Sequence, residues 1–168
     1  PPEKWESSPY PVLSRTGLDR DPVDLADPEA RLWLKACLGP DDLETPARFD
    51  RAAGLFLELA REKTGPRLER VSFAEAPAWL AGLKPHPEEG LLVFNAQASD
   101  FLDDGEHAAL KKGLAGALAP WEDRAFWAEL ELPRGRDPEA GPGLHELREH
   151  RLMDGRLEGE GGGLRGVR

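Results

Sequence analysis

The 168-residue sequence contains one cysteine, one methionine, one asparagine and one glutamine. A single cysteine, Cys37, excludes a disulfide within the chain and a structural zinc site built on cysteines, and it favours a reducing, cytoplasmic location. No apolar run approaches the roughly 20 residues that span a membrane, so we expect no membrane partner. There is no basic stripe and the net charge is −10, so nucleic acid is not an expected partner either.

The composition that remains is typical of a globular protein, with 39% hydrophobic and 32% charged residues. Few amides, many charges and 16 prolines resemble the bias of thermophilic proteins. The length suits one hydrophobic core. We therefore predict an extended N-terminal arm over residues 1–11, a single domain over residues 12–160, and a flexible glycine-rich tail over residues 161–168.

Local signals place the helices and strands. Asp27 precedes a proline, as an N-cap residue does, and Asp103 with Glu106 matches a capping box. Gly65 is predicted to end the second helix in a left-handed conformation. The predicted helices begin near residues 27, 45, 75 and 103, and the predicted strands cover residues 12–18, 67–73, 90–97, 124–132, 146–152 and 156–160.

This alternation of strands and helices predicts an α/β fold. We expect a mostly parallel sheet that is covered by helices on both faces, with an antiparallel hairpin at its C-terminal edge. The hairpin follows from Asp154 and Gly155, because this pair favours a tight turn between two strands. The strand over residues 124–132 alternates two sets of side chains, with Phe126, Ala128, Leu130 and Leu132 on one face and Trp127, Glu129 and Glu131 on the other.

Ligands of open α/β sheets bind beyond the carboxyl ends of the strands. Asn95 and Gln97, the only two amides, lie where the apolar strand 90–97 turns polar, and their spacing puts them on one face. The same rule selects four polar clusters: Asp19 with Asp21, Phe73 with Glu75, Asn95 through Asp100, and Glu129 with Glu131. The alternative for each cluster is ordinary turn and cap chemistry.

Several apparent motifs fail on their context. Gly161, Gly163 and Gly166 match the spacing of a dinucleotide-binding loop, but no helix follows them. His145 and His150 are five residues apart rather than the four of a zinc-protease helix, so we expect surface histidines on a hairpin. No phosphate-binding loop, nucleophile elbow or Cys/His cluster is present, and no metal is expected.

Three stretches of the sequence carry a family resemblance: residues 15–25 (RTGLDRDPVDL), residues 91–102 (LLVFNAQASDFL) and the strand over residues 126–131. Together they resemble an uncharacterised bacterial family, a domain of unknown function with a methyltransferase-like Rossmann fold. The resemblance implies a three-layer Rossmann-like sandwich that binds S-adenosylmethionine. It places Asp19 at the ribose, Phe73 near the adenine and Asn95 near the reacting methyl group. The family's glycine-rich first strand has no counterpart in the chain.

Two functions remain open. The first is a methyltransferase-like enzyme that binds S-adenosylmethionine or a related adenosyl ligand. Its cofactor-binding residues would be Asp19, Asp21, Phe73 and Glu75. Its catalytic candidates would be Asn95 and Gln97. The second is a truncated, non-catalytic Rossmann-like module that acts through protein–protein interaction. An uncovered sheet edge in such a module would favour a homo-oligomer.

Overall fold

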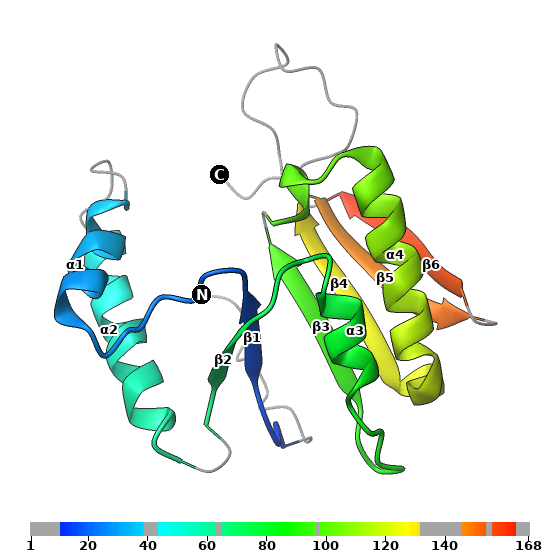
Figure 1. Ribbon diagram of the computed structural model, residues 1–168, viewed down its shortest axis with the longest axis horizontal. Helices are drawn as coiled ribbons and strands as arrows, with labels where there is room; N and C mark the ends of the chain where they lie inside the picture. The colour runs from blue at the N-terminus through cyan, green and yellow to red at the C-terminus, as the bar shows by residue number, and fades with distance from the viewer. Residues whose placement is uncertain are drawn as a thin grey trace. The chain divides into compact units, whose positions relative to one another are not determined.

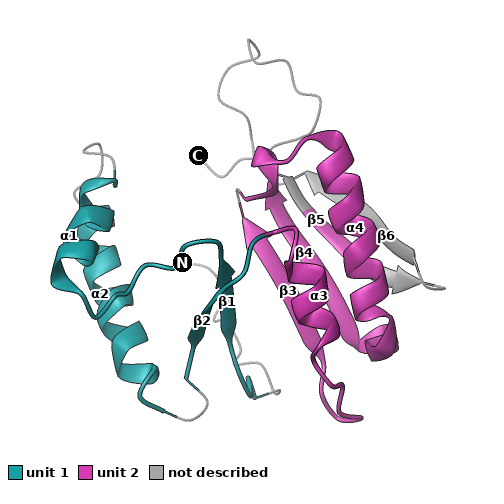
Figure 2. Ribbon diagram, viewed as in Figure 1, with its two compact units in different colours: residues 1–72 teal, residues 73–168 magenta. Residues whose placement is uncertain are grey.

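The computed structural model describes residues 11–38, 44–62, 65–96, 98–131, 146–153 and 156–163. The chain groups into two compact units, unit 1 over residues 1–72 and unit 2 over residues 73–168 (Figure 2). The single domain over residues 12–160 stays a prediction, and all but the last residue of the predicted arm over residues 1–11 lies outside the described residues. Each unit combines helices with a small sheet, in keeping with the predicted α/β class.

The described residues of unit 1 form one parallel strand pair and two helices (Figure 1). Strand β1 (Thr16–Asp19) pairs with β2 (Arg67–Arg70), and α1 (Pro28–Ala36) and α2 (Glu44–Leu59) come between them in sequence. The predicted start of α1 is confirmed, because Oδ1 of Asp27 accepts a hydrogen bond from the backbone N–H of Glu29 at 2.9 Å. Local cap chemistry thus sets where this helix begins.

Gly65, which follows α2, does not adopt the left-handed conformation that we predicted for it. A Cβ atom at this position would lie 1.9 Å from the carbonyl oxygen of Leu59, which is far inside contact distance. Glycine is needed here because the backbone passes directly over the end of the helix, and not because its φ angle is positive.

Unit 2 contains a four-stranded sheet in the order β3-β4-β5-β6. Strands β3 and β4 are parallel, whereas β4–β5 and β5–β6 are antiparallel. The C-terminal hairpin is confirmed, but the sheet is mixed and not mostly parallel. The elements are α3 (Ala76–Ala81), β3 (Leu91–Ala96), η1 (Ser99–Phe101), α4 (Asp104–Leu118), η2 (Ala119–Arg124), β4 (Ala125–Glu131), β5 (Glu146–Met153) and β6 (Arg156–Gly163).

Helices α3 and α4 lie on one face of this sheet and enclose the core of unit 2 (Figure 1). Leu114 and Leu118 of α4 pack in one cluster with Leu80 of α3 and Trp127 of β4. The predicted capping box starts α4. No described helix is long and apolar enough to cross a membrane.

The opposite face of the sheet carries apolar side chains that remain accessible. Leu92 and Phe94 of β3 point away from the core cluster and are 68% and 58% exposed. The described elements of unit 2 therefore cover one face of the sheet, and helical cover on its second face stays a prediction.

Candidate functional site

Polar side chains collect where the parallel strands β3 and β4 reach their carboxyl ends. Asn95 lies opposite Glu129 in the strand register, and Glu131 follows Glu129 on the same face of β4. Strand β5, helix α4 and the short helix η1 each add one side chain. We call this group the carboxylate cluster; its members are Asn95, Ser99, His107, Glu129, Glu131 and His150.

Glu129 is the centre of the carboxylate cluster and is fully buried. Its Oε1 lies 3.0 Å from Oγ of Ser99 and 3.2 Å from Nε2 of His107. Its Oε2 lies 2.8 Å from Nε2 of His150. Three side chains from three different elements thus converge on one carboxyl group.

These contacts decide the charge of Glu129. Burial alone would raise the pKa of its carboxyl group, because a charge is poorly solvated inside a protein. Hydrogen bonds from His150, His107 and Ser99, with a smaller electrostatic contribution from His107, outweigh burial and lower the pKa from 4.5 to about 2. Glu129 is therefore an ionised hydrogen-bond acceptor at neutral pH.

Glu131 ties the segment after β3 to the end of β4. Its Oε1 accepts hydrogen bonds from Nδ2 of Asn95 at 2.5 Å and from the backbone N–H groups of Ala98 and Ser99, both at 3.2 Å. Its Oε2 is buried and has no hydrogen-bond partner among the described residues. One oxygen of this 1%-exposed side chain is thus left for a further donor.

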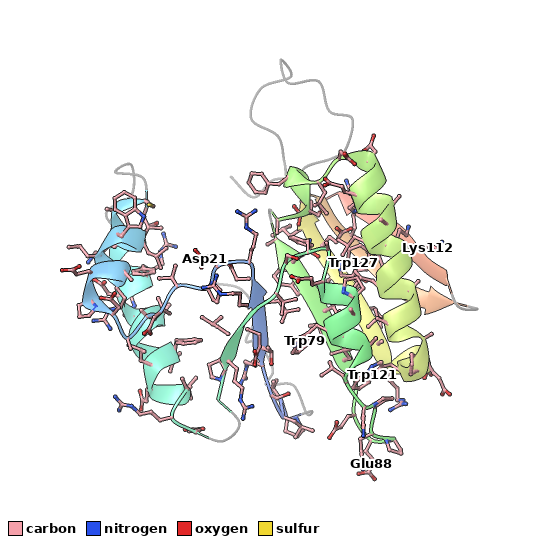
Figure 3. All side chains as sticks on the ribbon, in the orientation of Figure 1. Asp21, Trp79, Glu88, Lys112, Trp121 and Trp127 are labelled. Atoms are coloured by element: carbon pink, nitrogen blue, oxygen red, sulfur yellow. The ribbon has the colours of Figure 1, made fainter. Side chains whose placement is uncertain are left out.

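Asn95 lies at the carboxyl end of β3, where the sequence placed it, and both ends of its amide are engaged. Nδ2 donates to Glu131, while Oδ1 accepts a hydrogen bond from Nε1 of Trp127 at 2.7 Å. Trp127 lies on β4 in the layer between sheet and helices (Figure 3). Asn95 therefore orients its neighbours. Gln97, its predicted companion, lies outside the described residues.

His150 is not the surface histidine that we expected. It is 5% exposed, and its ring stacks on Trp127 with centroids 4.2 Å apart and planes at 22°. Its Nδ1 is buried without a hydrogen-bond partner among the described residues. The other predicted surface histidine, at position 145, lies outside the described residues.

The predicted cofactor-binding residues are divided between the two units. In unit 1, Oδ1 of Asp19 accepts the backbone N–H of Asp21 at 2.7 Å, and Asp21 pairs with Arg70 at 2.7 Å. In unit 2, Phe73 packs against the hydrophobic core, and Glu75 occupies the N-cap position of α3. A cofactor-binding role for these four residues stays a prediction.

The sequence selected Asn95, Ser99, Glu129 and Glu131 as strand-end residues, but it did not connect them with His107 or His150. One signal in the sequence pointed to these histidines. Trp127, Glu129 and Glu131 share one face of a strand, and two carboxyl groups beside a tryptophan on a buried face need hydrogen-bond donors. Among the described residues, no group of three or more His, Cys, Asp or Glu side chains is arranged to hold a metal ion. The described contacts of the carboxylate cluster include hydrogen bonds between its side chains, such as Ser99 to Glu129 and Asn95 to Glu131.

Comparison with known proteins assigns the chain to a bacterial family. The model of a family described as "Uncharacterized protein conserved in bacteria (DUF2332)" matches residues 1–161. No curated protein sequence and no solved structure matches the chain. The family match confirms the predicted resemblance to an uncharacterised bacterial family, and its description includes neither a methyltransferase fold nor a cofactor.

Proposed function

The chain belongs to DUF2332, a family of uncharacterised bacterial proteins, and we propose that its unit 2 binds a small ligand at the carboxyl ends of β3 and β4. The ligand we propose is S-adenosylmethionine or a related adenosyl compound, in a Rossmann-like, methyltransferase-like protein. Its place would be the carboxylate cluster, where two parallel strands end side by side.

The observation that carries this proposal is the unpartnered Oε2 of Glu131. A buried polar atom without a hydrogen bond costs roughly 1–3 kcal/mol, so such atoms are rare unless something else binds them. The opposite oxygen of the same carboxyl group already has three donors, which fix its position. A ligand hydroxyl or amino group would satisfy the remaining oxygen.

An adenosyl ligand fits this requirement, because its ribose hydroxyls and its adenine amine are hydrogen-bond donors. Carboxyl groups at strand ends hold ribose hydroxyls in other nucleotide-binding α/β folds. In this proposal Glu131 holds a hydroxyl of the ligand, and Asn95 keeps Glu131 in place. Bound S-adenosylmethionine would supply a reactive methyl group, while the roles of Asp19 at the ribose and Phe73 at the adenine remain predictions.

Isothermal titration calorimetry with S-adenosylmethionine and S-adenosylhomocysteine tests the proposal. We expect both to bind the full chain, and Glu131→Gln to weaken binding. A hydrogen bond to a charged group contributes about 1.5–3 kcal/mol, which corresponds to about a 10- to 100-fold change in Kd. Glu149→Gln is the matched control, because Glu149 is an exposed carboxyl group on the neighbouring strand β5.

Two outcomes would contradict this proposal. One is the absence of binding heat with both ligands on protein whose folding is verified by circular dichroism. The other is equal affinity in the wild type and Glu131→Gln, because the buried oxygen would then have no part in binding.

A second candidate is a non-catalytic module that self-associates through β3. The observation that favours it is the position of Leu92, which is 68% exposed on a strand at the edge of the described sheet. Edge strands offer unpaired backbone groups to a second chain, and a lysine on such a strand opposes pairing. We expect Leu92→Lys to lower the dimer fraction in size-exclusion chromatography with light scattering.

Leu32→Lys is the control for this experiment, because Leu32 of α1 is also 68% exposed but belongs to unit 1. Equal effects of the two lysines would show that the charge acts non-specifically. A wild-type protein that stays monomeric at every concentration would exclude self-association through β3.

A further inference from the structure

We propose that His107 is a base that accepts a proton from a hydroxyl group of the bound molecule, and that Glu129 positions His107 for this role. The inference rests on the proposed function for the place of the ligand, beside the carboxylate cluster. It adds the chemical class of the substrate, an alcohol or phenol that reacts through its oxygen.

The hydrogen bonds of Glu129 define which nitrogen of each histidine is free. An ionised carboxylate can only accept hydrogen bonds, so Nε2 of His107 and Nε2 of His150 must both carry hydrogen. In a neutral imidazole the other nitrogen then holds the lone pair. Both rings therefore present Nδ1 as the atom that can take up a proton.

The two histidines differ in solvent exposure. His150 is buried: its side chain is 6% exposed and its Nδ1 atom is buried. His107 lies on the first turns of α4 with 14% of its side chain exposed, and Nδ1 is not among the buried atoms that lack a partner. Of the two, His107 is the ring that can exchange a proton with a ligand.

A purely structural role explains this arrangement less completely. Ser99 and His150 already give each oxygen of Glu129 a hydrogen bond from a buried side chain. His107 adds a third bond from a partly exposed ring on a different element. Such an arrangement suits base catalysis, because a buried carboxylate fixes the tautomer of a histidine and stabilises the imidazolium.

The proton transfer is simple and balanced. The O–H bond of the substrate breaks, its proton binds Nδ1 of His107, and the electron pair stays on the substrate oxygen, which becomes the nucleophile. Glu129 remains ionised and pairs with the imidazolium. The other titratable groups of the carboxylate cluster are Glu131 on β4 and His150 on β5. Near His107 in sequence lie the N-cap residue Asp103 and, on α4, Asp104, Glu106 and Lys111.

Access is tested first, by acylation with diethyl pyrocarbonate, which reacts with unprotonated imidazole nitrogen. Peptide mass spectrometry of the full chain resolves each site. We expect His107 to react in the folded protein, as the exposed His86 does, and His150 to react only after unfolding. A native protein in which His86 reacts and His107 does not would overturn the proposal.

Proton acceptance is tested with 4-nitrophenol, whose ionised form absorbs visible light. Below the pKa of the free phenol, we expect the protein to increase the nitrophenolate absorbance, and His107→Gln to abolish the increase. Glu129→Gln should also abolish it, whereas Glu129→Asp should restore part of it, because the charge beside Nε2 is kept. Circular dichroism verifies that each variant is folded.

The variants separate this inference from the proposed function. Glu131→Gln should lower the affinity for the phenol but leave the ionisation of the bound phenol intact at saturation. His107→Gln should leave the affinity unchanged but abolish this ionisation. Ionisation that depends on His107 without any binding of adenosyl ligands would contradict the proposed function alone. No nitrophenolate increase in the wild type, or an increase that persists in His107→Gln, would overturn the role of His107.

Discussion

Replacing Glu129 by glutamine removes one buried charge with almost no change in shape, and the structure sets the size of the effect. The pKa of this carboxyl group is lowered from 4.5 to about 2 in the folded protein. One pKa unit corresponds to about 1.4 kcal/mol, so ionised Glu129 contributes about 3 kcal/mol to the free energy of unfolding. Glutamine resembles the protonated form, and Glu129→Gln should lose about this amount at neutral pH.

The sign of the pH dependence follows from the direction of the shift. A carboxyl group whose pKa is lowered by folding stabilises the protein above its unfolded pKa, near 4.5. That contribution decreases as the pH falls from about 4.5 towards 2, because the folded protein must then take up the proton. The stability gap between the wild type and Glu129→Gln should therefore be constant above pH 5 or so and close in acid.

Urea unfolding followed by tryptophan fluorescence measures this gap, since Trp127 is fully buried and stacks on His150. Subtracting the two proteins at each pH cancels the carboxyl groups that they share. Glu149→Gln, at an exposed position on β5, should show no gap. A gap between the wild type and Glu129→Gln that does not change between neutral pH and pH 3 would refute the assignment of the charge to Glu129.

Two further predictions concern helix α4. Gly113→Ala should destabilise unit 2 by about 1–3 kcal/mol, because the new Cβ would lie 2.8 and 2.9 Å from ring carbons of Pro77. Gly116→Ala is the control and should raise the melting temperature, because the space around Gly116 is open. Equal effects of the two substitutions would contradict the packing of α3 on α4. Asp103→Ala removes the carboxyl group that accepts a hydrogen bond from the backbone N–H of Glu106 at 2.7 Å. The free energy of unfolding, measured with urea, should fall by about 1 kcal/mol. An unchanged unfolding midpoint would show that the capping box does not stabilise the protein.

The sequence predicted well wherever the determining chemistry is local. Asp27 caps α1 and the Asp103–Glu106 box starts α4, as predicted, because an N-cap forms hydrogen bonds to residues two or three positions away. The turn after Met153 similarly predicted the antiparallel hairpin of β5 and β6. Each of these signals lies within a few residues of the structure that it specifies.

The environment of β4 could not be predicted in this way. Its sequence alternates an apolar set with a set that contains two glutamates, and hydrophobicity alone favours burial of the apolar set. The structure instead buries Trp127, Glu129 and Glu131, while Phe126 and Leu130 are only partly buried. The bonds that make this possible come from side chains 21 to 36 residues away in sequence, beyond the reach of any periodicity.

The sequence placed Asn95 correctly in the fold, whereas the function of this residue stays a prediction. Asn95 was chosen as the polar end of the central strand, and the structure places it there. Its hydrogen bonds to Glu131 and Trp127 engage both ends of its amide, and the base that we propose, His107, lies on α4 instead. A rule about strand ends identifies an edge of the sheet, but the reactive group on it depends on which helix packs above that edge.

The bond between His150 and Glu129 has a consequence for biosynthesis. These residues are 21 positions apart, so β4 leaves the ribosome before the strand that shields its acidic face. Until then, the nascent chain can offer Glu129 only Ser99 and His107 as partners. Arrival of β5 is therefore the step that completes the hydrogen bonds of Glu129, and a translational pause just before it would leave this carboxyl group with fewer partners in the growing polypeptide.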